Sequence, residues 1–105
     1  MDEIMEAVAL RARQSLGGRL RKVILFGSFA REDYDAQSDV DIMVLTENSD
    51  LKRDQARMDA IADAISLASD RTISIMLKDR AEFESRLYVP FYRNVAEEGR
   101  VLYAA

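Results

Sequence analysis

Two aspartates separated by one residue, Asp39 and Asp41, stand at the head of the apolar run at residues 42–45. Successive side chains of a strand point to opposite faces, so these two carboxylates are expected to project together. Adjacent carboxylates repel each other, and burying them on a core strand is costly unless a cation neutralises them. Oxygen ligands suit hard cations, so the pair predicts a site for Mg²⁺ or Mn²⁺, an ion that usually also binds substrate phosphates.

A glycine turn precedes these aspartates by ten residues. Gly27 and Ser28 follow the apolar run at residues 23–26, which predicts a buried strand that ends in a tight turn. The amides of a helix that starts here would cradle phosphate oxygens, and Arg31, one turn into that helix, would add a fixed positive charge. A Gly-Ser pair alone is more often a plain turn. Its spacing to the two acids is what predicts a phosphate-binding turn.

The combination resembles the signature of the nucleotidyltransferase superfamily, which is Gly-Ser, a gap of ten residues and then Asp-x-Asp. Here the signature reads Gly27-Ser28, ten residues, and Asp39-Val40-Asp41. The resemblance implies a small α/β fold, the polymerase-β-like nucleotidyltransferase fold, with a mixed sheet and helices packed against it. Phe29-Ala30-Arg31 and Ser38 also match residues that often accompany this signature. The site residues implied are Asp39 and Asp41 for catalysis and metal binding, and Gly27, Ser28, Arg31 and Ser38 for nucleotide binding.

The same resemblance implies a reaction: an acceptor hydroxyl attacks the α-phosphate of ATP or another nucleoside triphosphate, and pyrophosphate leaves. The shortness of the chain points further, to the minimal nucleotidyltransferases (MNT proteins), often the antitoxin half of HEPN–MNT toxin–antitoxin pairs. Residues 90–95 and 98–103 resemble the closing segment of that group, so the resemblance covers roughly the whole chain. For such an antitoxin the acceptor is a tyrosine of the HEPN partner, and its adenylylation would silence an RNase toxin.

One position departs from the family pattern. Catalytic members carry a third carboxylate on the strand predicted at residues 72–77, and the register places Ser74 there. A serine cannot be an anionic metal ligand or a strong general base, which leaves a two-metal mechanism in doubt. Asp70 and Asp79, at the two ends of this strand, are not expected to substitute for it. Asp79 belongs to a capping-box pattern that explains it structurally.

Two other functions stay open. The chain would be a binding module with a vestigial active site if it neutralises its partner by stoichiometric contact. Ser74 favours this reading, whereas Asp39 and Asp41 oppose it because two unneeded acids on a core strand would be a liability. An aminoglycoside-type nucleotidyltransferase is less favoured, because those enzymes resemble this chain only in its core and the length leaves no room for a separate acceptor-binding domain.

Length and composition predict one minimal nucleotidyltransferase domain over residues 1–105, with 49% hydrophobic and 32% charged residues. The absence of cysteine and histidine excludes disulfides, thiolate metal sites and Ser-His or Cys-His catalysis. No apolar run approaches the roughly 20 residues of a membrane span, so we expect a cytoplasmic protein without a membrane partner. The net charge of −4 argues against direct nucleic-acid binding. Both homo- and hetero-oligomers remain open.

The elements that must position the site can be read in outline. An opening helix at residues 2–16 has the apolar stripe Met1, Met5, Val8 and Ala12 and is ended by Gly17-Gly18. Strands are predicted at residues 22–26, 40–45, 72–77 and, as a short strand or tail, 101–103. A helix of about two turns is predicted after Ser28, and further helices at 51–69, after Asp79, and from Pro90 or Phe91 to about Glu98.

A helical crossover between the second and third strands predicts a parallel pair, while the short link between the first two would allow an antiparallel one. The site is expected at one edge of this three- or four-stranded sheet. In the helix at 51–69, charged side chains, Asp54 among them, are expected on or near the polar face. A basic cluster before the first strand is either a solvated helix end or a contact with nucleotide or an acidic partner; its members are Arg11, Arg13, Arg19, Arg21 and Lys22.

Overall fold

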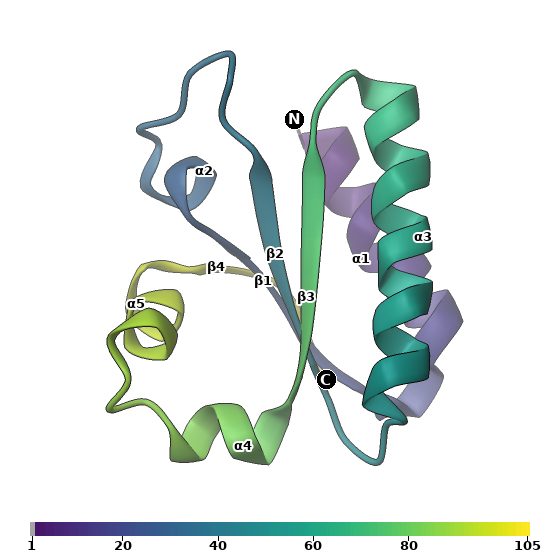
Figure 1. The fold of residues 1–105 in the computed structure, drawn as a ribbon, viewed down its shortest axis with the longest axis vertical. Helices are drawn as coiled ribbons and strands as arrows, with labels where there is room; N and C mark the ends of the chain where they lie inside the picture. Colours follow the sequence, from purple (N-terminus) through teal and green to yellow (C-terminus); the bar gives the residue numbers. More distant parts are fainter. Residues whose placement is uncertain (1) are drawn as a thin grey trace.

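The computed structural model describes residues 2–105, and Met1 of the predicted apolar stripe lies outside the described residues. Figure 1 shows the helices and strands of the chain. In order, they are α1 (Asp2–Leu16), the 3₁₀ turn η1 (Gly17–Arg19), β1 (Leu20–Phe26), α2 (Ser28–Arg31), β2 (Val40–Thr46), α3 (Leu51–Ser69), β3 (Ile73–Asp79), α4 (Arg80–Ser85), α5 (Pro90–Glu98) and β4 (Arg100–Ala104).

The four strands form one sheet in the order β3-β2-β1-β4. β1 is antiparallel to both β2 and β4, whereas β2 and β3 are parallel. The 19 residues of α3 make the crossover that a parallel pair requires. The mixed α/β fold predicted from the sequence is therefore confirmed, and residues 100–104 form a true edge strand.

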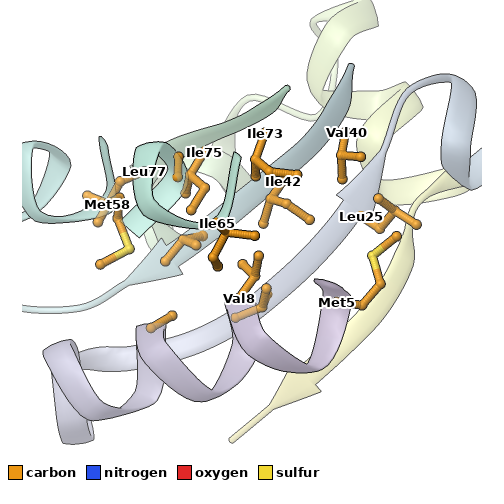
Figure 2. Close-up of a cluster of buried hydrophobic side chains, with 14 of the residues drawn as sticks. Met5, Val8, Leu25, Val40, Ile42, Met58, Ile65, Ile73, Ile75 and Leu77 are labelled. Carbon is orange, nitrogen blue, oxygen red and sulfur yellow. The ribbon is translucent and has the colours of Figure 1, made fainter. Parts of the chain in front are cut away.

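Helices α1 and α3 cover one face of the sheet (Figure 1) and enclose the larger core. Alternate residues of β2, namely Val40, Ile42 and Val44, point into this core. Figure 2 shows Met5 and Val8 of α1 packed toward the strand side chains. The strand side chains on this face are therefore buried in the core.

The opposite face holds a smaller apolar cluster beneath α4 and α5, made of Ile24, Met43, Leu45, Phe83 and Val95. The cluster covers β1 and β2 but leaves the outward side chains of β3 at Ser74 and Met76 exposed. As the capping-box pattern predicts, the Asp79 carboxylate accepts a hydrogen bond from the amide of Glu82 and starts α4. An open area therefore remains on this face.

Three sequence predictions need correction. The helix after Ser28 has one turn instead of about two, because Glu32 adopts a left-handed conformation (φ 61°) that ends it. Asp54 is not on the polar face of α3 but is fully buried. Its place on the helix explains this, since Asp54 precedes Met58 by four residues and lies on the same buried stripe. β1 begins at Leu20, two residues before the predicted start.

Two members of the predicted basic cluster, Arg19 and Arg21, pair with acids of the same chain. Arg19 binds Asp54 at 3.2 Å, and the Arg21 Nε lies 3.9 Å from a carboxylate oxygen of Glu47. Arg13 stacks over the ring of Tyr103 at 4.8 Å. Neither predicted role, a solvated end or an external contact, describes Arg19. No helix within residues 2–105 has the length and apolar character needed to cross a membrane.

Candidate active site

The turn after β1 lies directly against the second aspartate. Gly27 has φ +76°, a conformation that L side chains rarely adopt, and its carbonyl accepts hydrogen bonds from the amides of Ala30 and Arg31. A Cβ added to Gly27 would lie 2.7 Å from the Asp41 Oδ2 atom. Only glycine fits here, for both reasons, so the fold brings the predicted turn and a predicted metal ligand into contact.

The charge of Asp41 is only partly compensated by its surroundings. It is half-buried on β2, where it pairs with Phe26 of β1 and Ser74 of β3. Burial raises the pKa of Asp41 above its usual value, the charge of Asp39 raises it further, and the charge of Arg31 lowers it. Asp39 itself is exposed and precedes the first residue of the strand. The burial cost expected for both carboxylates therefore falls on Asp41.

The site lies where β1 ends and β2 begins. Because β2 is an inner strand between β1 and β3, the expectation of a site beside a sheet edge is wrong. The antiparallel β1–β2 pair brings Phe26 opposite Asp41 and so places the turn at the head of β2. The site thus occupies one end of the two inner strands, on the face that α4 and α5 only partly cover.

The other predicted site residues surround this point on α2 and the loop after it. Arg31 is exposed and its Nε lies 3.2 Å from a carboxylate oxygen of Asp33. Ser38 accepts a hydrogen bond from the Asp35 amide at 3.0 Å and closes the loop before β2. Ser28 is half-buried at the first position of α2. Arg31 influences Asp41 through its charge, whereas Ser38 acts here as a turn residue.

A stack of three side chains, which the sequence analysis did not find, holds this region. The buried ring of Phe29 stacks on Tyr34 with centroids 4.2 Å apart, and the Arg71 guanidinium lies 5.3 Å from the Phe29 centroid. The stack ties α2 and its following loop to the residues just before β3. Phe29 and Tyr34 are only five residues apart, but Arg71 lies far along the chain, so no spacing pattern could reveal the whole stack.

Ser74 lies on β3, the third strand, as the sequence predicts. It pairs with Asp41 across the parallel β2–β3 ladder, and partner residues of such a pair point to the same face. Asp79 caps α4 and Asp70 caps the end of α3, so neither moves into the third position. Within residues 2–105, no three or more acids come together as a metal-binding group.

This donor set decides which metal arrangement fits. Mg²⁺ is commonly held by one or two carboxylates, with water and substrate phosphates completing its coordination. Asp39 and Asp41, with a raised pKa at Asp41, fit one such ion carried on a triphosphate. The bridging carboxylates that a two-metal site normally needs are missing from the described residues.

Comparison with known proteins adds independent findings. The family model described as "Nucleotidyltransferase domain" matches residues 7–103. Two proteins of Methanocaldococcus jannaschii, each named a putative protein adenylyltransferase, are similar in sequence. One is 38% identical over 89 residues, which cover 82% of this chain and 81% of that protein. The other is 42% identical over 59 residues, which cover 56% of this chain and 60% of that protein.

Solved structures share the fold. A chain in a toxin–antitoxin crystal structure with AMP-PNP matches with a TM-score of 0.64 at 17% identity, over 95% of this chain and 73% of that chain. A chain in the complex of tri-AMPylated Shewanella oneidensis HEPN toxin with MNT antitoxin matches with a TM-score of 0.60 at 18% identity, over 100% of this chain and 74% of that chain. A nucleotidyltransferase-like protein from Sulfolobus solfataricus matches with a TM-score of 0.60 at 19% identity, over 98% of this chain and 82% of that chain. At such identities these matches establish the fold.

Proposed function

This chain belongs to the nucleotidyltransferase domain family, and we propose that it is an adenylyltransferase that moves AMP from ATP to a hydroxyl group of a protein. The observation that carries the proposal is the contact between Gly27 and Asp41, which sets a phosphate-binding turn against a half-buried carboxylate with a raised pKa. The names of the two similar Methanocaldococcus jannaschii proteins support protein adenylylation as the form of transfer.

The roles of the residues follow from their positions. Asp39 and Asp41 would hold Mg²⁺ or Mn²⁺, which when bound draws charge from the phosphoryl oxygens and orients the reacting groups. The backbone of Gly27 and the hydroxyl and amide of Ser28 bind the outer phosphates, and Arg31 offsets their negative charge. Ser38 holds the loop before β2 in shape through Asp35.

The proposed reaction is an in-line displacement at the α-phosphate. A bond forms between the acceptor oxygen and phosphorus while the bond to the pyrophosphate oxygen breaks, so the products are the AMP-modified protein and pyrophosphate. The acceptor hydroxyl must also lose its proton. Ser74, opposite Asp41, is not a strong enough base to take it, so we assign the proton to solvent.

We further propose that the acceptor is a tyrosine of a HEPN toxin and that the chain, as a single minimal domain, is its antitoxin. Structures with the same fold occur in complexes of a HEPN toxin with an MNT antitoxin, and one such toxin is AMPylated.

A second candidate is a stoichiometric inhibitor that binds such a partner without transfer. Ser74 favours it, because the position opposite Asp41 lacks the carboxylate of catalytic members.

The decisive experiment uses ATP labelled on its α-phosphate, Mg²⁺, and a candidate HEPN partner. We expect the wild type to label the partner, and the double variant Asp39→Ala/Asp41→Ala to lose about a thousandfold in rate. Asp63→Ala, which removes an exposed carboxylate of α3, is the matched control and should label at the wild-type rate. If wild type and double variant form an equally tight complex without any label, the protein is a stoichiometric inhibitor.

A further inference from the structure

A cavity of about 200 Å³ adjoins the proposed phosphate site on the side of α5. Its lining consists of Phe26, Gly27, Arg31, Phe91, Asn94, Val95 and Glu98. Gly27 and Arg31 already belong to the proposed site, but the residues of α5 have no part in the function described so far. In Figure 1, α5 and α2 lie on the same side of the sheet. The question is what the α5 wall of this cavity would bind.

Helix α5 is fixed close to β1 by its C-terminal glycine. A Cβ on Gly99 would lie 2.5 Å from the Ile24 Cγ2 atom and 3.3 Å from the Leu25 carbonyl oxygen. Only glycine permits this approach, which packs the buried Val95 into the same cluster as Ile24. The wall of the cavity is therefore a rigid part of the fold.

The aromatic part of this wall is held in place and still accessible. The Phe91 ring contacts the Phe26 ring edge-on, with centroids 5.7 Å apart, and the Tyr92 ring at 5.4 Å. Phe91 nevertheless remains 41% exposed. A ring that its neighbours orient, and that stays partly open, is suited to stack on a flat ligand such as a nucleobase.

The polar part of the wall can read a base edge. Asn94 lies one turn after Phe91 on α5, and its amide offers both a donor and an acceptor, the combination that pairs with the amino and ring-nitrogen groups of adenine. Glu98, one turn further, adds an acceptor suited to an amino group or a ribose hydroxyl. The cavity is below the roughly 300 Å³ of typical small-molecule pockets. Its size suits one ring system and not a whole nucleotide.

We propose that this cavity is the nucleoside subsite, where Phe91 stacks on the adenine ring and Asn94 reads its edge while the turn at Gly27 and Ser28 holds the phosphates. This inference rests on the proposed function, because it needs a triphosphate at the turn. It names the residues that select the base. The acceptor side chain is then left to approach from the open face beside β3.

Calorimetric titration with two ligands, ATP and inorganic tripolyphosphate, each with Mg²⁺, separates the subsite from the phosphate site. We expect Phe91→Leu and Asn94→Ala each to weaken ATP binding about tenfold and to leave tripolyphosphate binding unchanged. Asn94→Ala should also reduce the preference for ATP over GTP. Glu97→Gln, at an exposed position of the same helix that does not line the cavity, should change neither ligand.

The outcomes are distinguishable. Unchanged ATP affinity in both cavity variants, or an equal loss for ATP and tripolyphosphate, overturns the subsite while the proposed function stands. A normal ATP affinity combined with a raised KM for the protein acceptor also overturns it, because the cavity then receives the acceptor side chain. A wild type that binds tripolyphosphate and ATP with the same affinity shows that the base makes no contact. A wild type that binds neither ligand contradicts the proposed function itself.

Discussion

Asp41 and Asp54 lie near opposite ends of β2, and both are withdrawn from water, but their surroundings differ. The side chain of Asp54 is fully buried, and both of its oxygens lie 3.2 Å from the Arg19 guanidinium. The hydroxyl of Ser49 donates a further hydrogen bond at 2.6 Å. Burial acts to raise the pKa of Asp54, but Ser49 and Arg19 outweigh it and hold that pKa below its usual value.

At Asp41 the balance is reversed. Burial and the neighbouring Asp39 raise the pKa of Asp41, and the cation whose charge reaches it, Arg31, makes its own ion pair with Asp33. A buried carboxylate with a structural role is paired with cations and hydrogen-bond donors of the same chain, as Asp54 is. A carboxylate that is not fully neutralised, such as Asp41 beside the glycine turn, is a candidate ligand for a bound cation. The two aspartates thus distinguish a stabilising cluster from the proposed binding site.

The largest expected effect follows from removing the charge of Asp54. Asp54→Asn should lower the free energy of unfolding by about 3 kcal/mol at neutral pH, because the partner arginines lose their carboxylate. The pKa of Asp54 lies below the ordinary 3.8 in the folded chain, so its ionisation stabilises the fold above that value and the gain is lost as pH falls through the folded pKa. Urea titrations should therefore show the deficit shrinking in acid.

Asp41→Asn is the matched control, since it makes the same chemical change at the other aspartate. The pKa of Asp41 is raised on folding, so ionisation costs stability as pH rises from 3.8 through the folded pKa. The amide variant should be as stable as wild type or more stable at neutral pH, and the difference should vanish in acid. A loss equal to that of Asp54→Asn would break the comparison, because Asp41 would then be a structural charge.

The next effect compares two glycines. Gly27 and Gly17 both have positive φ, +76° and +57°, but a Cβ on Gly17 would meet no atom within 4 Å. Gly17→Ala should therefore cost only backbone strain, about 1 kcal/mol, measured by urea unfolding. Gly27→Ala should cost about 2 kcal/mol and should also weaken binding of ATP with Mg²⁺, because the new methyl group displaces the Asp41 carboxylate.

The contact itself can be tested by removing the carboxylate. In an Asp41→Ala background, Gly27→Ala should cost less than it does in the wild type, since the atom that it meets at 2.7 Å is gone and only the strain of its backbone remains. An unchanged cost in that background would mean that the turn resists alanine for reasons of its own backbone. The close approach of turn and carboxylate would then have no part in fixing the site.

Short-range patterns explain what could be predicted from the sequence. The spacing of Gly27 to Asp41 between two apolar runs predicts the candidate site, and the resemblance to the family predicts Ser74 at the position of a third carboxylate. The pairing of Ser74 with Asp41 comes from the structure. The roles of these residues stay predictions. Their proximity is what the structure adds.

Contacts between distant segments explain what was missed. Arg19 and Asp54 are 35 residues apart, so spacing could not pair them, although the four-residue step from Asp54 to the buried Met58 was a usable signal. Gly99 follows the last residue of α5, a position where glycine commonly ends a helix. Its true constraint is the approach of α5 to β1, and this tertiary contact forms the wall of the cavity.

The smallest effect concerns the position opposite Asp41. Ser74 is exposed and in register with Asp41, so Ser74→Asp would place a third negative charge beside Asp41 and Asp39. Without Mg²⁺ and at low salt, this repulsion should lower the free energy of unfolding by about 0.5 kcal/mol, because water screens an exposed charge. Millimolar Mg²⁺ should remove the deficit and stabilise Ser74→Asp more than wild type, since three carboxylates bind the ion more tightly than two.

Ser74→Asn has nearly the same shape without the charge, so its response to Mg²⁺ should match that of wild type. If Ser74→Asp and Ser74→Asn respond equally, residue 74 does not share the metal site with Asp41, and the difference between the two ends of β2 rests on Asp39 and Asp41 alone.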